Sequence, residues 1–258
     1  MGRATWASRP VESAMLEPRL VQRALRYRYS HDPCEMREML KRLPRGGCGI
    51  DIGVHKGAYS WWMCRAVGRT GRVVGVEPQA ELAERAAKAL GRDPRYSLFR
   101  GAVSDHEGTA TLTIPDDGPS HGATLRDLSA SDGAEQMRTR EVPITTLTLL
   151  AEREKLPRVD FIKCDAEGHE LAIFRGGVGL LERDRPAALI ECDRTFGSQD
   201  DPVGELREIF EPLGYRGWCI FKDGLVPIED FEYDVHQRED RAKHDHGHNF
   251  LFAHPDRG

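Results

Sequence analysis

The stretch that decides the fold is GIDIGVHKG, residues 49–57. Its apolar residues predict a buried strand that ends at Asp51. A turn carrying Gly53 and Gly57 follows, and then the start of a helix. Glycine lets the backbone approach a ligand closely, and the free N–H groups at a helix start favour a carboxylate or phosphate. We therefore expect this turn to bind part of a ligand.

A second acidic residue ends the next predicted strand. The sequence GVEP, residues 75–78, places Glu77 at the strand tip, and Pro78 ends the strand because it lacks a backbone donor. An acidic residue at the tip of the second strand suits the two hydroxyls of a ribose. Taken singly, Asp51 could cap its turn and Glu77 could be a solvated strand end. Together, at adjacent strand tips, they indicate a nucleoside site.

The turn favours S-adenosylmethionine over a dinucleotide. A dinucleotide site needs G-x-G-x-x-G, whereas this turn has only Gly53-x-x-x-Gly57. The carboxylate of Asp51 would also meet the like charge of a pyrophosphate. The methionine end of S-adenosylmethionine carries an ammonium group, which tolerates that carboxylate. We expect S-adenosylmethionine, with NAD as the alternative.

Outward from this turn, short apolar segments alternate with helical patterns. The predicted helices cover 60–67, 80–90, 171–181 and 203–213, and the predicted strands cover 48–54, 72–76, 96–103, 159–164, 187–192, 217–221 and 249–253. Such alternation predicts an α/β fold with a doubly wound, largely parallel sheet. A further half-exposed strand is expected at 109–114. Residues 1–44 predict an N-terminal helical extension, and residues 45–258 predict the main domain.

Composition excludes several classes of protein. The chain has 258 residues and a net charge of −5, which argues against a nucleic-acid or membrane partner. It contains no apolar run long enough to span a bilayer and no visible signal peptide. The six cysteines include no C-x-x-C pair, and Cys48, Cys164 and Cys192 lie in or beside apolar runs. We expect buried core cysteines and a cytoplasmic location.

Several motifs together resemble the FkbM family of methyltransferases. They are DIGVHKG (51–57), GVEP (75–78), AVSD (102–105) with Gly108, VPITTL (142–147), DFIKCDAEGHE (160–170) with Arg175-Gly176, and NFLF (249–252). The resemblance covers roughly residues 45–254. Two positions depart from the family pattern: His55 stands where the family often has Asn, and Thr148 replaces the Asp of a T-L-D sequence.

The resemblance implies a class I, Rossmann-like methyltransferase sheet of seven strands with the last strand antiparallel. It implies an O-methyltransferase that uses S-adenosyl-L-methionine and acts on sugars, polyketides or similar secondary metabolites. By the same resemblance, Asp51, Gly53, His55 and Gly57 hold the methionine part of the cofactor, and Glu77 with Pro78 binds the ribose. The residues implied to flank the adenine are Ala102, Val103, Ser104 and Asp105.

Methyl transfer to a hydroxyl requires alignment of the reacting atoms and removal of a proton. Ligands of such sheets bind beyond the carboxyl ends of the strands, so we expect Asp165, His169 and Glu191 to be catalytic, with Asp165 also close to the cofactor. Each has a structural alternative: a turn residue for Asp165 and His169, a charged rim for Glu191. Together with Asp193, Asp165 and Glu191 could hold Mg²⁺, which we do not favour. Lys163 is expected to pair with a carboxylate.

Two segments carry open interpretations. Residues 115–137 are polar and rich in turn residues, which is typical either of a lid over the acceptor site or of a plain surface excursion. His244, His246 and His248 alternate, so an extended segment would put them on one face. They could form a metal clip, supply a base, or belong to an ordinary loop before the last strand.

The leading hypothesis is therefore a small-molecule O-methyltransferase. The alternatives are an NAD-type oxidoreductase on a similar sheet and a non-catalytic, cofactor-binding relative. The expected partner is a small molecule that offers a hydroxyl group, such as a sugar or natural product. A homo-oligomer is also considered, because residues 1–44 could cover a neighbouring active site.

Overall fold

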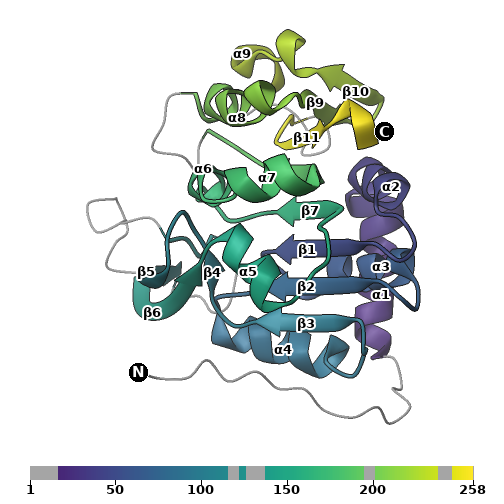
Figure 1. Ribbon diagram of the computed structural model, residues 1–258, viewed down its shortest axis with the longest axis vertical. Coiled ribbons are helices and arrows are strands. Elements are labelled where there is room, and N and C mark those ends of the chain that lie inside the picture. The colour runs from purple at the N-terminus through teal and green to yellow at the C-terminus, as the bar shows by residue number, and fades with distance from the viewer. Residues whose placement is uncertain (1–16, 116–121, 126–136, 195–200, 238–245, 258) are drawn as a thin grey trace.

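The computed structural model describes residues 17–115, 122–125, 137–194, 201–237 and 246–257. Its main sheet has eight strands in the order β10-β9-β11-β8-β7-β1-β2-β3 (Figure 1). The strands are β1 (Cys48–Ile52), β2 (Arg72–Val76), β3 (Tyr96–Phe99), β7 (Phe161–Cys164), β8 (Ala187–Glu191), β9 (Arg216–Phe221), β10 (Gly224–Pro227) and β11 (Asn249–Ala253).

Strand direction confirms the expected doubly wound sheet. β3, β2, β1, β7 and β8 run parallel, and β11 pairs antiparallel with both β8 and β9. This is the seven-stranded arrangement with an antiparallel last strand. The sheet has one more strand than expected, because β10 folds back antiparallel on β9 at the edge. The central strands β1, β7 and β11 are buried along their whole length, and apolar residues predominate in each.

Helices cover both faces of the sheet (Figure 1). Two hydrophobic cores result, one on each face. One contains side chains of α1 (Pro18–Arg26), α2 (Pro33–Arg42), α3 (Ala58–Val67) and α4 (Ala80–Leu90). The other contains side chains of α5 (Leu147–Arg153), α6 (Glu170–Arg175), α7 (Val178–Asp184) and α8 (Pro202–Phe210). All six cysteines are buried and free, and Cys48, Cys164 and Cys192 belong to the second core.

The expected helices of the N-terminal extension are present from Pro18 onward. A five-residue π-helix, Tyr27–His31, joins α1 to α2. The helices dock on α3 through buried apolar side chains and through the Trp62 indole, which donates to the carbonyl oxygen of Ala24 at 2.7 Å. Because they share a core with the sheet, the boundary of the extension at residue 44 stays a prediction.

Two expectations about elements were wrong, and one strand was not expected. The single strand at 96–103 is two strands in different sheets: β3 ends at Phe99, and β4 (Ala102–Val103) pairs with β6 (Met137–Thr145) in a small sheet completed by β5 (Gly108–Pro115). β6 was not expected at all. The helix at 171–181 is broken at Gly176, whose backbone lies against Asp105: a Cβ there would stand 2.5 Å from the Asp105 Cα.

The small sheet lies beyond the carboxyl ends of β1, β2 and β3 (Figure 1). The expected half-exposed strand at 109–114 is confirmed as β5. Most of the expected lid at 115–137 falls outside the described residues, as does His244. In the described ranges, no helix is long and apolar enough to cross a membrane.

Candidate functional site

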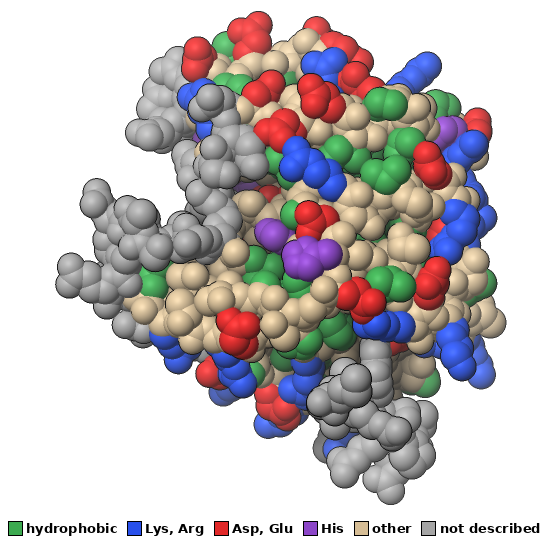
Figure 2. Space-filling view, turned by 60° about the vertical axis from the view of Figure 1, so that its left-hand side comes forward, with side chains coloured by type: hydrophobic (Ala, Val, Ile, Leu, Met, Phe, Trp, Pro, Cys, Tyr) green, Lys and Arg blue, Asp and Glu red, His purple; other side chains and the backbone are tan. Residues whose placement is uncertain are grey.

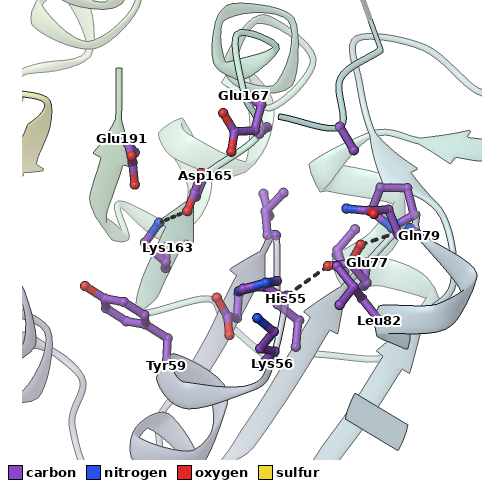
Figure 3. A pocket seen from close by; sticks show the side chains of 18 of the residues that line it. His55, Lys56, Tyr59, Glu77, Gln79, Leu82, Lys163, Asp165, Glu167 and Glu191 are labelled. Atoms are coloured by element: carbon purple, nitrogen blue, oxygen red, sulfur yellow. Dashed lines mark hydrogen bonds and ion pairs between the residues drawn. The ribbon is translucent and has the colours of Figure 1, made fainter. Parts of the chain in front are cut away.

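A pocket of about 370 Å³ opens at the carboxyl ends of β1, β2, β7 and β8. Figure 3 shows acidic side chains from these strand ends around it. Gly57, Ser104, Asp105 and Asp193 do not line it. The expected site residues that do are Asp51, Gly53, His55, Glu77, Pro78, Ala102, Val103, Asp165, His169 and Glu191.

The turn after β1 is built for close backbone contact. Gly53 has a φ of +78°, and a Cβ there would lie 2.1 Å from the carbonyl oxygen of Asp165. A hydrogen bond joins this turn to the turn that follows β7: the Asp165 N–H donates to the carbonyl oxygen of Ile52 at 3.1 Å. His55 also adopts a positive φ of +50°, a conformation that Asn and His adopt more readily than most residues. Contacts with the turn at Gly53 therefore fix the backbone position of Asp165.

The carboxylate of Asp51 lies beneath this turn. It is buried and accepts a hydrogen bond from the Ser60 hydroxyl in α3. Burial raises its pKa to about 6, against the opposing effects of the Ser60 hydrogen bond and of Lys163. The serine thus holds one oxygen of Asp51 in a fixed direction.

Glu77 is fixed by its own neighbours in the chain. Its Oε2 accepts from the His55 N–H at 2.8 Å and its Oε1 from the Gln79 N–H at 2.9 Å, as the dashed lines in Figure 3 show. Burial raises its pKa to about 7, opposed by these two hydrogen bonds and reinforced by Asp165 and Asp51. Two backbone donors leave each oxygen a free lone pair for a ligand hydroxyl.

A buried charge cluster occupies the other half of the pocket. Lys163 in β7 is 4% exposed, and its Nζ lies 3.4 Å from Oδ2 of Asp165, which confirms the expected pairing (Figure 3). Burial alone would lower the pKa of Lys163, but Asp165, Glu191 and Asp51 together raise it. Burial and Asp165 raise the pKa of Glu191 well above its usual range. The surrounding carboxyl groups therefore favour the charged form of this buried lysine.

His169 faces the pocket but is held by another side chain. Its Nε2 lies 2.9 Å from the Ser104 hydroxyl, and burial lowers its pKa. Ser104 thus lies behind His169, while Asp105 is exposed and pairs with His106. Of the four residues expected at the adenine, Ala102 and Val103 are the two that line the pocket.

Of the three residues considered for a metal, Asp165 and Glu191 line the pocket and Asp193 does not. Asp193 points to His246, whose Nε2 lies 2.7 Å from its Oδ2. In the part of the chain that the structure describes, no group of three or more His, Cys, Asp or Glu side chains could hold a metal ion. His248, the last of the alternating histidines, lines the pocket beside Asn249.

Glu167 connects the pocket to the described part of the expected lid. Its Oε1 accepts from the Gly122 N–H at 3.0 Å, and its backbone adopts a φ of +50°. Burial and Asp165 raise the pKa of its carboxyl group. Ala123 and Leu125 line the pocket, so residues 122–125 border it.

Sequence reasoning missed the wall contributed by the N-terminal helices. Tyr27, His31 and Asp32 line the pocket, and Asp32 Oδ2 accepts from the Tyr59 hydroxyl at 2.9 Å. The cations Arg23, Arg26 and Lys56 line it too. The apolar stripe of the first helix predicts that it packs against the domain, but no local pattern tells which residues then face the site.

Known proteins of similar sequence and structure are methyltransferases. A family model described as "Methyltransferase FkbM domain" matches residues 51–216. No curated protein shows a significant sequence match. Among solved structures, methyltransferase FkbM from Methylobacillus flagellatus KT is 15% identical, with a TM-score of 0.48. That match covers 92% of this chain but only 56% of the other, so this chain spans little more than half its length.

Two further solved structures are similar over nearly their whole length. The O-methyltransferase from Bacillus cereus, in complex with S-adenosylhomocysteine, is 16% identical with a TM-score of 0.46, covering 93% of this chain and 92% of that one. The O-methyltransferase TomG from Streptomyces achromogenes, in complex with S-adenosylmethionine, is 14% identical with a TM-score of 0.47, covering 93% and 91%. The family match spans well over half of the chain, and on it the chain belongs to the FkbM family of methyltransferases.

Proposed function

We propose that this protein transfers the methyl group of S-adenosylmethionine to a hydroxyl group of a small molecule such as a sugar or other secondary metabolite. The observation that carries the proposal is the pairing of two features in one pocket. Glu77 offers two fixed carboxylate oxygens, and the Lys163–Asp165–Glu191 cluster lies across from it (Figure 3). Family membership favours this function over an NAD-type oxidoreductase.

The residues present fit the cofactor. Glu77 suits the two ribose hydroxyls because both of its oxygens keep acceptor capacity after binding the backbone. Gly53 has no side chain to block a ligand over the turn, and the buried carboxylate of Asp51 suits an ammonium group. Apolar side chains that line the pocket suit the adenine: Val76, Leu82, Ala102, Val103 and Leu112. When bound, S-adenosylmethionine supplies an activated methyl group.

Proton removal falls to the carboxyl cluster. The Asp165 carboxylate would accept the proton of the acceptor hydroxyl as the methyl group is transferred, and would then release it to solvent. The Lys163 ammonium keeps its own proton and holds Asp165 at the strand end. Burial and Asp165 raise the pKa of Glu191, which favours its neutral form, and this form would donate a hydrogen bond to the acceptor. Ser104 holds the ring of His169 in place, so His169 would help to position the acceptor on this side of the pocket.

The proposal includes no metal and no nucleic-acid partner. A metal is not required by this scheme, because Lys163 supplies the positive charge near the reacting oxygen. Figure 2 shows acidic and basic side chains interspersed over the face toward which the strand ends point, in keeping with the net charge of −5. A cytoplasmic location and a homo-oligomer remain predictions.

The test begins with cofactor binding and ends with transfer. Calorimetry should detect S-adenosylhomocysteine and not NADH. Incubation with radiolabelled S-adenosylmethionine and a panel of sugars and phenols, each beside its O-methylated form and its amino analogue, should label only the free hydroxyl compounds. Labelling of the amino analogues instead would refute O-transfer, and binding of NADH alone would refute the whole proposal.

A further inference from the structure

Three cationic side chains form one wall of the pocket. Arg23 and Arg26 come from α1, and Lys56 comes from the turn between β1 and α3. The Arg23 guanidinium donates through Nη1 to the carbonyl oxygen of Lys56 at 3.1 Å. This hydrogen bond joins α1 to the turn after β1 and gives Arg23 a defined position beside Lys56.

The charge of this wall is not balanced by protein carboxylates. Within the described ranges of the chain, none of the three side chains forms an ion pair with Asp or Glu, although many other arginines do. The neighbours that act on Lys56 are themselves cations: burial lowers its pKa, and Arg23 and Arg85 lower it further. Cations gathered without a counter-ion beside a pocket create a field that attracts an anion.

The rest of the pocket has the opposite character. Its floor holds the carboxyl groups of Asp51, Glu77, Asp165 and Glu191. An anionic group of a ligand would be repelled by this floor and attracted to the wall. S-adenosylmethionine carries one anionic group, the carboxylate of its methionine part, whereas its sulfonium and ammonium groups are cations. Charge complementarity therefore orients the ligand in one direction.

We propose that Arg23, Arg26 and Lys56 bind the methionine carboxylate of S-adenosylmethionine, an inference that rests on the proposed function. Guanidinium groups suit this task because their N–H donors match the geometry of a carboxylate. Arg23 and Arg26 lie outside residues 51–216, the range of the family match. The first helix thus completes a cofactor site that the matched segment leaves open on one side.

Calorimetry with two probes tests the assignment. S-adenosylhomocysteine carries the carboxylate, and 5′-methylthioadenosine keeps the nucleoside and sulfur but lacks the amino-acid part. Arg23→Gln, Arg26→Gln and Lys56→Gln should each weaken S-adenosylhomocysteine binding by about 5- to 30-fold, as expected for hydrogen bonds to a charged group near solvent. The same substitutions should change 5′-methylthioadenosine binding by less than about twofold. Arg19→Gln, on the same helix but away from the pocket, is the matched control.

Each outcome decides the matter. An equal loss for both probes would show an effect on pocket shape and would overturn the assignment, as would unchanged binding of both. Thermal unfolding of each variant shows whether it is folded. If the two arginine variants are unfolded, Lys56→Gln, which leaves α1 unchanged, tests the assignment by itself. If the unaltered protein binds 5′-methylthioadenosine but not S-adenosylhomocysteine, the carboxylate assignment fails. If it binds neither, the proposed function fails with it.

Discussion

Cofactor affinity should depend on pH through Glu77. Only the ionised carboxylate can accept hydrogen bonds from both ribose hydroxyls while it also accepts the two backbone N–H groups. Since burial raises the pKa of Glu77 to about 7, roughly one molecule in ten is ionised at about pH 6 and roughly nine in ten at about pH 8. The affinity for S-adenosylhomocysteine should therefore increase about tenfold over this range.

Glu77→Gln should remove that dependence and weaken binding. The amide oxygen can replace one carboxylate oxygen, but the amide nitrogen then faces a backbone N–H, which loses its acceptor. Losing hydrogen bonds to a charged group costs about 1.5–3 kcal/mol, or roughly 13- to 160-fold in affinity at about pH 8. The loss should be smaller at about pH 6, where the unaltered protein is mostly protonated at this position.

Calorimetry at several pH values between about 6 and 8 measures both quantities. The sign for stability is opposite: a carboxyl group with a raised pKa stabilises the fold below its unfolded pKa and loses this contribution as pH rises through about 7. The ligand-free protein should thus become less stable as its affinity increases. A tenfold pH effect that persists in Glu77→Gln would refute the argument and point to Asp51, whose pKa is about 6.

Three further substitutions probe the same pocket. Asp165→Asn should leave S-adenosylhomocysteine affinity unchanged and reduce turnover by about 10²-fold or more. If EDTA abolishes the activity of the unaltered protein and Mg²⁺ restores it, this carboxylate instead binds a metal. Gly53→Ala should destabilise the fold by about 2 kcal/mol or more in urea unfolding, because its Cβ meets the Asp165 carbonyl oxygen; a change near zero would mean that the turn relaxes. Lys163→Met should lower the free energy of unfolding by about 3–5 kcal/mol at neutral pH, because it leaves buried carboxylates without their cation. The loss should be smaller at about pH 5, where carboxyl groups take up protons, and an equal loss at both pH values would assign the effect to packing.

Elements with a strong local pattern were predicted well. The strand at 72–76, the helix at 80–90 and the strand at 249–253 match β2, α4 and β11 residue for residue. In each, apolar spacing, a turn residue and burial all favour the same structure. Such agreement between local preference and global fold leaves little room for an alternative.

The elements that failed depend on contacts made far along the chain. Residues 138–141 of β6 are exposed and only three residues towards its end are buried, so β6 forms because β5 and β4 pair with it. The strand break after Phe99 needs Gly101, where a Cβ would stand 2.4 Å from the Pro143 carbonyl oxygen. Neither pairing leaves a signature in its own segment, so the single-strand expectation at 96–103 could not anticipate the second sheet.

The site shows the same division. Asp51, Glu77 and Asp165 were found because an acidic residue at the end of an apolar strand, or directly after it, must lie at the edge where ligands bind. Tyr27, Asp32 and the cationic wall were not found, because their place depends on how α1 and α2 pack across the sheet. Strand ends are fixed by the parallel sheet, whereas a docked helix can present any of several faces.

The buried lysine explains how this acidic floor is stable. Asp51, Asp165 and Glu191 approach one another in a region of low dielectric, where like charges repel strongly. Lys163 offsets one of these charges at 3.4 Å, and burial and Asp165 raise the pKa of Glu191, which favours its neutral form. The two neighbouring carboxyl groups thus have different surroundings, the condition under which one can accept a proton while the other donates a hydrogen bond. The arrangement that stabilises the floor is thus the arrangement that the proposed transfer requires.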